Sequence, residues 1–381
     1  MESTKLHMSL RDRLLAFRDS VISNPGFQRF AALFPLMRPV ARRRAGAMFD
    51  LCAGFVYSQI LLACVRLRLL DELARGPVGT AELATRLSLP RESMQLLLDA
   101  AVALELAQPR SRDRYGLGLL GAELRGNPGV TAMIEHHAFL YNDLRDPVAL
   151  LRGEAGSGQL SGYWPYANAD SPANLSGDEV APYTALMSAS QPMIAQHVLH
   201  VYNFRTHRCL LDVGGGDGAF IGAVAAQAPQ LRCMLFDLPA VAEQAAARFQ
   251  AKGLSSRATA LGGSFLTDPL PQGADVISLV RVLHDHDDDT VMTLLRAARA
   301  ALPADGTLVV AEPMVGGGGA ENFGAAYFAF YLLAMGSGKP RSFARISGML
   351  GDSGFSGIKI LPTAMPLVTS VITAGTAPTM C

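Results

Sequence analysis

The sequence predicts an α/β protein: a doubly wound, mostly parallel sheet with an antiparallel closing strand, preceded by a smaller helical domain of winged-helix type. Three observations predict this fold. From residue 209 onward, short apolar runs alternate with helical segments. The first of these runs ends in a glycine-rich string, and the region before residue 125 has the order helix, turn, helix and hairpin. With 381 residues, 50% hydrophobic and 17% charged, the chain is long enough for more than one domain and too apolar for global disorder.

Charge and cysteine usage exclude several classes of protein. Lys+Arg and Asp+Glu are both 33, so a net charge of zero argues against nucleic-acid binding through bulk charge. The cysteines form no CxxC pair, which indicates reduced thiols in a cytoplasmic protein and no disulfide framework or zinc site. They are Cys52, Cys64, Cys209, Cys233 and Cys381.

The first 45 residues form a basic, partly amphipathic arm. Residues 1–50 carry nine Lys/Arg against four acids, with several Phe and Leu among them. Two interpretations stay open: contact with an anionic membrane surface, or a solvated helical arm that packs on a partner subunit. No leader-like segment is evident, and the apolar stretch Leu51–Val65 is shorter than the ~20 residues of a spanning helix. We therefore expect a soluble, cytoplasmic protein, which is compatible with both interpretations of the arm. If the arm contacts a membrane, the expected surface is that of the inner membrane.

Residues 46–125 predict a winged-helix domain. A helix over 48–75 ends at Gly76-Pro77, Thr80 caps a short helix, and Pro90 opens a second one. In that second helix Met94, Leu97, Leu98 and Ala101 share one apolar face. A polar turn and a short strand follow. The same helix carries Glu92, Asp99 and Glu105 against Arg91, and an acidic face does not suit DNA. The pattern favours a dimerisation domain, and hence a homodimer, over a DNA reader.

The rest of the chain divides into a helical linker and acceptor-pocket region, 126–200, and an α/β domain, 201–381. The linker contains a loop rich in Gly, Ser and Pro from Gly153 to Gly177. The expected strands of the α/β domain are Leu210–Val213, Cys233–Phe236, Val276–Leu283 and Leu308–Ala311, with a closing antiparallel pair, Ile358–Leu361 and Leu367–Ala374.

The first strand ends in Asp212-Val213-Gly214-Gly215-Gly216-Asp217-Gly218-Ala219. Glycines at this point let the backbone turn tightly and approach a ligand closely. The string satisfies both the dinucleotide fingerprint G-x-G-x-x-[GA] and the pattern D-x-G-x-G-x-G, which imply different cofactors. In the second pattern, Asp212 is placed to orient a cationic amino acid moiety.

Asp237 ends the second strand, 21 residues after Gly216, before Leu238 and Pro239. An acid at this spacing accepts hydrogen bonds from the hydroxyls of an adenosine ribose. NAD and S-adenosylmethionine both carry that ribose, so the acid alone does not choose between them. The alternative role of Asp237 is a helix N-cap ahead of Pro239.

The later strand ends decide the choice. Val282-Leu283-His284-Asp285 and Ala311-Glu312-Pro313, together with the glycine string and Phe236-Asp237-Leu238-Pro239, resemble the class I small-molecule O-methyltransferases that use S-adenosylmethionine. The resemblance covers roughly residues 46 to 381. It is greater still to the bacterial carotenoid 1-hydroxyl methyltransferases, of hydroxyneurosporene or demethylspheroidene type. Their pattern is matched by Gly54-Phe55-Val56-Tyr57-Ser58-Gln59, by residues 146–154 and by Tyr327-Phe328-Ala329-Phe330-Tyr331.

This resemblance implies a Rossmann-like methyltransferase domain, S-adenosylmethionine as cofactor, and roles for particular residues. His284 corresponds to the general base and Glu312 to the acid that orients it; without the resemblance, His284 could equally be a polar residue at a strand end. The implied cofactor contacts are Asp212, Gly214, Gly216, Asp237, Leu238, Ser264, Phe265 and Arg281.

Three positions depart from the family pattern. Gly338-Lys339-Pro340-Arg341 has proline where relatives often carry a second acid, so a two-acid arrangement around His284 is in doubt. Ser264 replaces an acid that meets the adenine amino group, although Phe265 can still stack on adenine. Arg281 replaces a tryptophan and could reach the cofactor carboxylate.

Two further groups of residues complete the expectations. His284 to Asp289 could be taken for a metal cluster, but a helix begins at about Asp289 and acids there favour capping, so we predict no metal. The acceptor pocket is expected to be apolar, and for each candidate the alternative is core or dimer packing. The candidates are Met187, Tyr327, Phe330, Tyr331 and Met335.

The leading hypothesis is therefore an O-methyltransferase that acts on a hydroxylated acyclic carotenoid, a small apolar substrate. Methylation of another apolar pigment or polyketide, such as a bacteriochlorophyll ring carbon, is the alternative within the same class. An NAD-dependent dehydrogenase and a winged-helix regulator are the alternatives from other classes. Asp212 and the His284/Glu312 pair disfavour the dehydrogenase, and the acidic helix disfavours the regulator.

Overall fold

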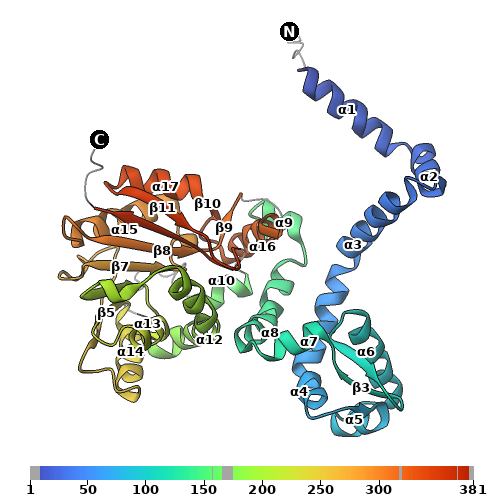
Figure 1. Ribbon diagram of the computed structural model, residues 1–381, viewed down its shortest axis with the longest axis horizontal. Coiled ribbons are helices and arrows are strands. Elements are labelled where there is room, and N and C mark those ends of the chain that lie inside the picture. Colours follow the sequence, from blue (N-terminus) through green and yellow to red (C-terminus); the bar gives the residue numbers. More distant parts are fainter. Residues whose placement is uncertain (1–8, 157, 165–174, 317–319, 367, 377–381) are drawn as a thin grey trace. The chain divides into compact units, whose positions relative to one another are not determined.

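The computed structural model describes residues 9–156, 158–164, 175–316, 320–366 and 368–376. The chain divides into two compact units, Met1–Ala122 and Glu123–Cys381. Each is considered by itself (Figure 1). The loop expected over 153–177, the strand expected from Leu367 and the terminal Cys381 fall partly or wholly outside the described residues.

The first unit is helical with one small sheet. Its elements are α1 (Leu10–Ser23), α2 (Pro25–Leu33), α3 (Arg38–Arg66), α4 (Leu69–Ala74), β1 (Val78–Gly79), α5 (Thr80–Arg86), α6 (Arg91–Ala103), β2 (Ala107–Arg110), β3 (Arg114–Leu117) and α7 (Leu119–Arg125), whose last residues fall in the second unit. The strands pair antiparallel in the order β1-β3-β2. Met94, Leu98 and Ala101 of α6 are buried, as their spacing predicts. Helices followed by a hairpin confirm the winged-helix pattern.

Local details of this unit differ from the sequence prediction. The single helix expected over 48–75 is two helices, because Arg68 adopts a left-handed conformation (φ 54°) that interrupts the helical hydrogen bonding between α3 and α4. Thr80 is the first residue of α5, and Gly79 is its N-cap. Pro90 is the N-cap of α6 and not its first helical residue.

Helix α3 is longer than the apolar stretch that we identified from the sequence. It runs for 29 residues, and by length and composition alone it could cross a membrane. The test is weak, because core helices of soluble proteins also pass it. Leu62, Cys64 and Val65, near its C-terminal end, are buried within the unit, whereas Phe49, Leu51 and Phe55 are exposed.

The second unit contains the large sheet. Its elements are α8 (Pro128–Asp143), α9 (Pro147–Leu151), α10 (Gln159–Tyr163), α12 (Gly177–Val201), η2 (Phe204–Thr206), β4 (Cys209–Val213), α13 (Ala219–Gln227), β5 (Arg232–Asp237), α14 (Pro239–Ala251), β6 (Ala258–Gly262), β7 (Val276–Val280), η3 (Leu283–Asp285), α15 (Asp288–Ala301), β8 (Thr307–Glu312), β9 (Met314–Val315), α16 (Ala320–Met335), β10 (Arg341–Ser342), α17 (Phe343–Asp352), β11 (Ser356–Leu361) and β12 (Ser370–Gly375).

The sheet has the strand order β11-β12-β8-β7-β4-β5-β6. Strands β4 to β8 are parallel, and β12 pairs antiparallel with both β8 and β11. The doubly wound sheet with an antiparallel closing pair is therefore confirmed. Strand β6 ends at Gly262, where a third strand without stated bounds was expected to end, and the run expected to be a strand through Leu283 ends as a strand at Val280 before the single turn η3.

Helices cover both faces of this sheet (Figure 1). Residues of α15 and α17 pack in one apolar cluster with the sheet, and residues of α12, α13 and α14 pack in another on the opposite face. Every residue of β4 and of β7 is buried, as a sheet covered on both sides requires. The strand order reverses between β4 and β7, so a crevice opens where their carboxyl ends diverge.

Candidate active site

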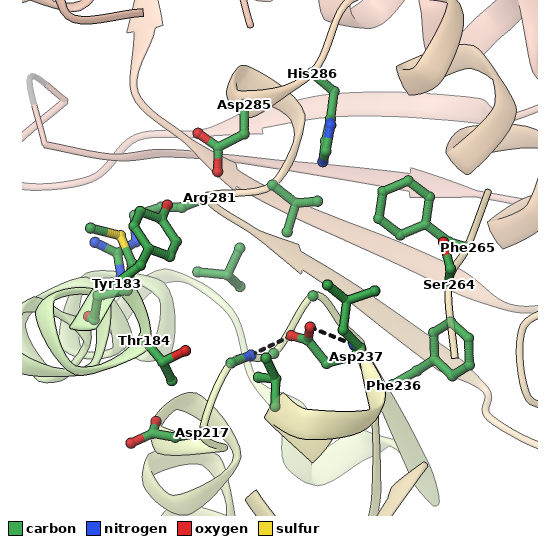
Figure 2. Close-up of a pocket in the computed structure, with 18 of the residues that line it drawn as sticks. Tyr183, Thr184, Asp217, Phe236, Asp237, Ser264, Phe265, Arg281, Asp285 and His286 are labelled. Atoms are coloured by element: carbon green, nitrogen blue, oxygen red, sulfur yellow. Dashed lines mark hydrogen bonds between the residues drawn. The ribbon is translucent and has the colours of Figure 1, made fainter. Parts of the chain in front are cut away.

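A cavity of about 420 Å³ lies at the carboxyl ends of the central strands. This volume is in the ordinary range of small-ligand pockets. Its walls are formed by the segments that follow β4, β5, β6 and β7, and by one side of α12 (Figure 2). The expected cofactor residues in the lining are Gly214, Gly216, Asp237, Leu238, Ser264, Phe265 and Arg281.

The glycine loop takes its shape from left-handed backbone conformations. Gly214 has φ 67°, and a Cβ there would lie 2.8 Å from a methyl group of Val282. Gly216 has φ 59°, and its backbone N–H donates to Oδ2 of Asp237 at 2.8 Å. The loop is therefore held against the end of the second strand with its backbone facing the cavity, which glycine permits and other residues would strain.

Asp237 connects the loop to the following helix. Its Oδ1 accepts from the backbone N–H of Leu238 at 2.7 Å. Leu238 is the N-cap of α14, and no side chain caps that helix, so the capping alternative for Asp237 is wrong. Burial raises the pKa of Asp237 to about 6, although the two N–H donors work against that shift. The carboxylate is thus a partly buried hydrogen-bond acceptor in the cavity wall.

Asp212, expected to orient a cationic amino acid moiety, lies behind the cavity wall and is not among the residues that line it. It is 1% exposed, and the Ser278 hydroxyl donates to its Oδ1 at 2.5 Å. Its Oδ2 has no hydrogen-bond partner among the described residues, and a Cβ on Gly215 would lie 2.6 Å from it. Burial raises the pKa of Asp212 to about 7. A positive charge nearby would stabilise the ionised form.

Ser264 and Phe265, the residues expected near the adenine, belong to one part of the cavity wall. Phe265 meets His286 edge to face, with ring centroids 5.3 Å apart. The backbone N–H of Ser264 donates to Asp268 at 2.8 Å. The sequence predicted Phe265 at this place but not His286, which was considered only for metal binding or as a neighbour of the helix cap.

Arg281 follows β7 and occupies a left-handed conformation, φ 57°. Its guanidinium donates to groups of α12: the Ser190 hydroxyl at 2.7 Å, the Met187 carbonyl at 3.0 Å, and the Gln191 amide oxygen. Its Nε is buried with no partner among the described residues. Arg281 therefore lines the cavity, but most of its hydrogen bonds tie the end of β7 to α12.

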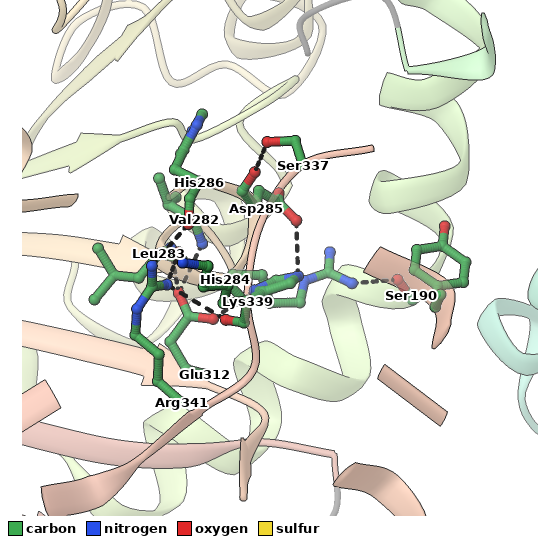
Figure 3. Close-up of polar contacts among 12 residues, drawn as sticks. Ser190, Val282, Leu283, His284, Asp285, His286, Glu312, Ser337, Lys339 and Arg341 are labelled. Carbon is green, nitrogen blue, oxygen red and sulfur yellow. Dashed lines mark hydrogen bonds and ion pairs between the residues drawn. The ribbon is translucent and has the colours of Figure 1, made fainter. Parts of the chain in front are cut away.

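His284 and Glu312 are brought together as expected, from the ends of two adjacent strands (Figure 3). Nδ1 of His284 lies 2.5 Å from Oε2 of Glu312. The other carboxylate oxygen of Glu312 accepts from the backbone N–H groups of Val282 and Leu283 at 2.8 and 2.7 Å. Glu312, which is 1% exposed, thus fixes both the imidazole and the turn that carries it.

A second acid contacts the imidazole, and it is the next residue in the chain. Nε2 of His284 lies 3.0 Å from Oδ1 of Asp285. Burial by itself lowers the pKa of His284, but the charges and hydrogen bonds of Asp285 and Glu312 outweigh burial and raise the pKa to about 10. The sequence analysis missed Asp285 as the second acid, although it stands in the quoted Val282-Leu283-His284-Asp285 motif.

The segment after α16 supports this turn from behind. Arg341 donates to the carbonyls of Leu283 and His286 at 2.5 and 2.8 Å, and the backbone N–H of Lys339 donates to the His284 carbonyl at 3.0 Å. Gly338 (φ 87°) is required there, since a Cβ would lie 2.2 Å from the His284 carbonyl oxygen. The Gly338–Arg341 stretch therefore supports the backbone of the His284 turn. It contributes a cation, Arg341, in the stretch where relatives often carry a second acid.

The acidic run after His284 caps a helix, as expected. Asp287 is the N-cap of α15, and its Oδ1 accepts from the Thr290 N–H at 2.8 Å. Asp288 pairs with Arg341 and Arg345 at 2.7 Å each. Within the described residues, no group of three or more His, Cys, Asp or Glu side chains could hold a metal ion.

The expected acceptor residues divide into three sets. Met187 lines the cavity itself. Tyr327, Tyr331 and Met335 belong to an adjoining apolar cluster of α8, α9, α10, α12 and α16, which we call the aromatic cluster. Phe330 does not join them, because its side chain lies on the exposed side of α16 (37% exposed). The described members of the aromatic cluster are Phe139, Leu140, Leu144, Leu150, Leu160, Trp164, Tyr183, Tyr327, Tyr331, Leu332, Ala334 and Met335.

The aromatic cluster adjoins both the cavity and the catalytic turn. Trp164 and Tyr183 line the cavity and stack with centroids 4.9 Å apart. At the other side, Phe328 meets the ring of His284 edge to face at 6.2 Å. Two histidines of α8 contact the same helix, α16: His136 lies 2.9 Å from the Tyr331 hydroxyl and His137 lies 2.7 Å from that of Tyr327. Sequence analysis did not single out Trp164, Tyr183 or these histidines.

A parallel sheet of this strand order, with a glycine loop, a ribose-type acid and a strand-end histidine, defines a methyltransferase of the S-adenosylmethionine-dependent class. Comparison with known proteins agrees. The family model of the O-methyltransferase domain matches residues 141–356, and that of the O-methyltransferase dimerisation domain matches residues 49–122. The chain therefore belongs to the O-methyltransferase family, which excludes the dehydrogenase and regulator alternatives and supports a homodimer.

Individual relatives agree with the family. The chain is 46% identical over 348 residues to demethylspheroidene O-methyltransferase of Cereibacter sphaeroides, covering 91% of both proteins. It is 42% identical to the protein of the same name from Rhodobacter capsulatus, covering 91% of this chain and 87% of that one. Human N-acetylserotonin methyltransferase in complex with S-adenosylmethionine has the same fold (TM-score 0.73, 22% identity, 88% of this chain and 98% of that one).

S-adenosylmethionine fits the residues at the cavity. The partly buried carboxylate of Asp237 would accept from ribose hydroxyls, and the glycine loop has no side chains in the way at Gly214 and Gly216. The unpartnered, buried oxygen of Asp212 provides a negative charge toward which a cationic amino acid group and sulfonium are attracted. Phe265 and His286 are aromatic rings of the cavity wall that would contact the adenine. Ser264 stands where relatives carry an acid that meets the adenine amino group. A polar contact with the adenine at this position would therefore come from the Ser264 side chain.

Proposed function

We propose that this O-methyltransferase methylates the C1 hydroxyl of an acyclic hydroxy-carotenoid, of the demethylspheroidene or hydroxyneurosporene type. The observation that carries the proposal is the 46% identity, over 91% of both chains, to an enzyme named for that reaction. Sequence similarity of this extent spans the cofactor side and the acceptor side of the molecule alike.

The aromatic cluster supports an apolar, extended acceptor. Its residues continue from the cavity wall at Trp164 and Tyr183 to the α16 side chains Tyr327 and Tyr331. Aromatic and aliphatic surfaces favour a polyene, because burial removes its hydrocarbon surface from water.

In the proposed reaction the bound cofactor supplies an electrophilic methyl group, and the protein must orient the acceptor hydroxyl in line with it and remove its proton. The residues proposed for the proton are His284 and Glu312, the base and its orienting acid. Their contact at 2.5 Å at the end of β7 and β8 supports that assignment. The proposed acceptor residues Met187, Tyr327, Tyr331 and Met335 would bind the chain of the substrate, and Phe330 is withdrawn from that set.

The test is turnover of S-adenosylmethionine and a 1-hydroxy acyclic carotenoid in detergent, with product mass as the readout. The comparison is wild type against His284→Ala. A methyl ether from the wild type and a loss of at least ~100-fold in the variant are expected. Product from chlorin or aromatic acceptors alone, with S-adenosylmethionine binding intact, would contradict the carotenoid assignment.

We further propose that residues 1–45 attach the enzyme peripherally to the cytoplasmic surface of the inner membrane. Residues 9–45 form α1, α2 and the start of α3, and their large apolar side chains are mostly exposed. Arginines stand among them, with Arg42, Arg43 and Arg44 consecutive. A helix with exposed apolar and basic side chains binds an anionic lipid surface by burying the first and pairing the second. The proposed acceptor is apolar and would dissolve in the membrane, so attachment there would bring the enzyme to its substrate.

Vesicle co-sedimentation tests the membrane proposal. Full-length protein is mixed with vesicles of neutral lipid alone or with 30% or so anionic lipid, and Arg42, Arg43 and Arg44 are replaced together by Gln. Each basic residue near an anionic surface contributes about 1 kcal/mol, so the triple variant should bind about 100-fold more weakly. A matched control replaces Arg112, Arg145 and Arg152 by Gln. Equal binding of all three proteins would contradict the proposal.

A further inference from the structure

His286 is a polar ring in the cavity wall whose two nitrogens are not used by the fold. It lines the cavity beside Phe265, and the planes of the two rings meet at 83°. Figure 2 shows the imidazole pointing inward from the turn that follows β7. Among the described residues, neither ring nitrogen of His286 makes a hydrogen bond with a side chain or with the backbone. These nitrogens are therefore available to a ligand in the cavity.

The backbone around His286 fixes the place from which the ring projects. The His286 carbonyl accepts from the Arg341 guanidinium at 2.8 Å, and the His286 N–H donates to the Leu283 carbonyl at 3.4 Å. The next residue, Asp287, is the N-cap of α15. The turn is thus held on both sides of the residue, and the contact with Phe265 restricts rotation of the ring. A side chain held in this way loses little freedom when a ligand binds to it.

The His286 imidazole is neutral at pH 7. Burial lowers the pKa of His286 below its usual value, and it outweighs the opposing effect of the Asp285 carboxylate. In a neutral imidazole one nitrogen carries a proton and the other has a free lone pair. The ring therefore offers the cavity one hydrogen-bond acceptor, which a protonated ring would lack.

Other side-chain acceptors near Phe265 already hold the loop after β6 together. The Ser264 side chain is 7% exposed, and its hydroxyl oxygen accepts from the Leu266 N–H at 3.3 Å. The Asp268 carboxylate accepts from the Ser264 N–H at 2.8 Å and does not line the cavity. A ligand amino group placed against this part of the wall would therefore find an unused acceptor at the His286 ring.

Adenine carries an amino group on an aromatic ring, and this group gives up water when the ring packs against Phe265. We infer that a ring nitrogen of His286 accepts a hydrogen bond from the amino group of the cofactor adenine, so that His286 determines which nucleobase the site binds. Asp287 is the rival acceptor in the lining, but its Oδ1 caps α15 and its side chain is exposed. A contact with Asp287 would replace a bond to water and gain little. The inference goes beyond the proposed function, because it concerns the cofactor and not the acceptor.

The test removes the amino group from the ligand and the nitrogens from the ring, separately and together. The two ligands are S-adenosylhomocysteine and its analogue in which the purine carries hydrogen in place of the amino group. The Kd of each is measured by titration calorimetry, without any acceptor molecule. The protein change is His286→Phe, which keeps a flat ring and loses both nitrogens. The matched control is His200→Phe, the same exchange at an exposed position of α12 outside the cavity lining.

The wild type and the His200→Phe control should bind S-adenosylhomocysteine about tenfold more tightly than the analogue, the effect of one buried hydrogen bond. His286→Phe should bind the two ligands with Kd values within about twofold of each other, because the partner of the amino group is gone. His286→Gln, whose amide oxygen can accept, should restore a preference of at least ~threefold. If phenylalanine prevents folding, His286→Leu removes the same nitrogens with a smaller side chain, and the same equality is expected.

Several results would overturn the inference. Equal binding of the two ligands by the wild type would mean that the amino group has no partner in the site. A preference that persists in His286→Phe would assign the amino group to Asp287 or to a backbone carbonyl, and a preference abolished by Ser264→Ala would assign it to that hydroxyl. These measurements use only the cofactor product, so they stand even if the acceptor is not a carotenoid.

Discussion

One carboxylate, Glu312, makes three contacts that shape the reacting end of the site, so exchanging it for glutamine is the most informative single substitution. Oε1 accepts from the backbone N–H groups of Val282 and Leu283, and Oε2 contacts Nδ1 of His284. Glutamine has the same size but only one acceptor oxygen. It can keep the two backbone contacts, and then its NH₂ group faces Nδ1 and forces the imidazole to give up that proton.

The magnitudes follow from this geometry. Loss of one buried hydrogen bond to a charged partner costs about 1.5–3 kcal/mol of unfolding free energy. At about 2–4 °C per kcal/mol for a unit of this size, the Tm should fall by roughly 3–12 °C. A carboxylate-to-amide exchange behind a catalytic histidine can cost up to ~10⁴-fold in kcat, because the wrong tautomer results. We therefore expect a loss of at least ~100-fold in kcat for Glu312→Gln, because His284 is the proposed base and Glu312 orients it.

The assay is methyl ether formation followed by mass, with Tm and S-adenosylhomocysteine binding measured on the same protein. Glu243→Gln, at an exposed position of α14, is the matched control. The folded pKa of His284 lies above its unfolded value of about 6.5. Its ion pairs therefore stabilise the fold below that pH, and this contribution is lost as the pH rises through about 10. The Tm difference should accordingly shrink above pH 10. An active variant with unchanged Tm at pH 7 would refute the reasoning.

Three further substitutions test other parts of the site. Binding of S-adenosylmethionine should release protons near pH 7, and its affinity should rise with pH up to about 7, because a nearby cation lowers the raised pKa of Asp212. Titration calorimetry in buffers of different ionisation enthalpy measures the proton release. The Asp212→Asn variant should show neither the proton release nor the pH dependence. Gly338→Ala places a Cβ against the His284 carbonyl at φ 87° and should cost about 1–3 kcal/mol, visible as a lower Tm, whereas Gly348→Ala, where a Cβ meets nothing, should not. Arg281→Ala removes three contacts to α12 and should raise KM for the acceptor at least ~10-fold, measured under saturating S-adenosylmethionine.

The cofactor side could be predicted from the sequence because its geometry is local. A strand that ends in glycines, followed 21 residues later by an acid at the next strand end, allows few arrangements, and Gly216 and Asp237 do meet at 2.8 Å. Register in the parallel sheet likewise places the ends of β7 and β8 side by side, so His284 and Glu312 had to be neighbours. The motif correctly placed Asp212 at the end of the first strand, before the glycines. Its burial beneath Gly215 depends on packing that the motif does not encode.

The acceptor side could be predicted only in part. Tyr327, Tyr331 and Met335 recur at intervals of four residues and therefore share one face of a helix, and all three join the aromatic cluster. Phe330 lies one position before Tyr331, about 100° around the helix, and this spacing places it on a different face from the other three. His136 and Trp164 come from segments with no motif. Their positions depend on how α8 and α10 pack against α16, which short-range patterns do not specify.

The end of β7 couples the two halves of the site. The left-handed turn at Arg281, a conformation that costs about 1–3 kcal/mol in a residue other than glycine, directs the next two backbone N–H groups to Glu312. The guanidinium of the same residue binds α12, which carries the cavity residues Tyr183 and Met187. The strained turn persists because both sets of contacts hold it. The contacts of Arg281 and Glu312 therefore link α12, on the acceptor side, to the turn that carries His284, so a change that displaces α12 is expected to alter the orientation of the proposed base.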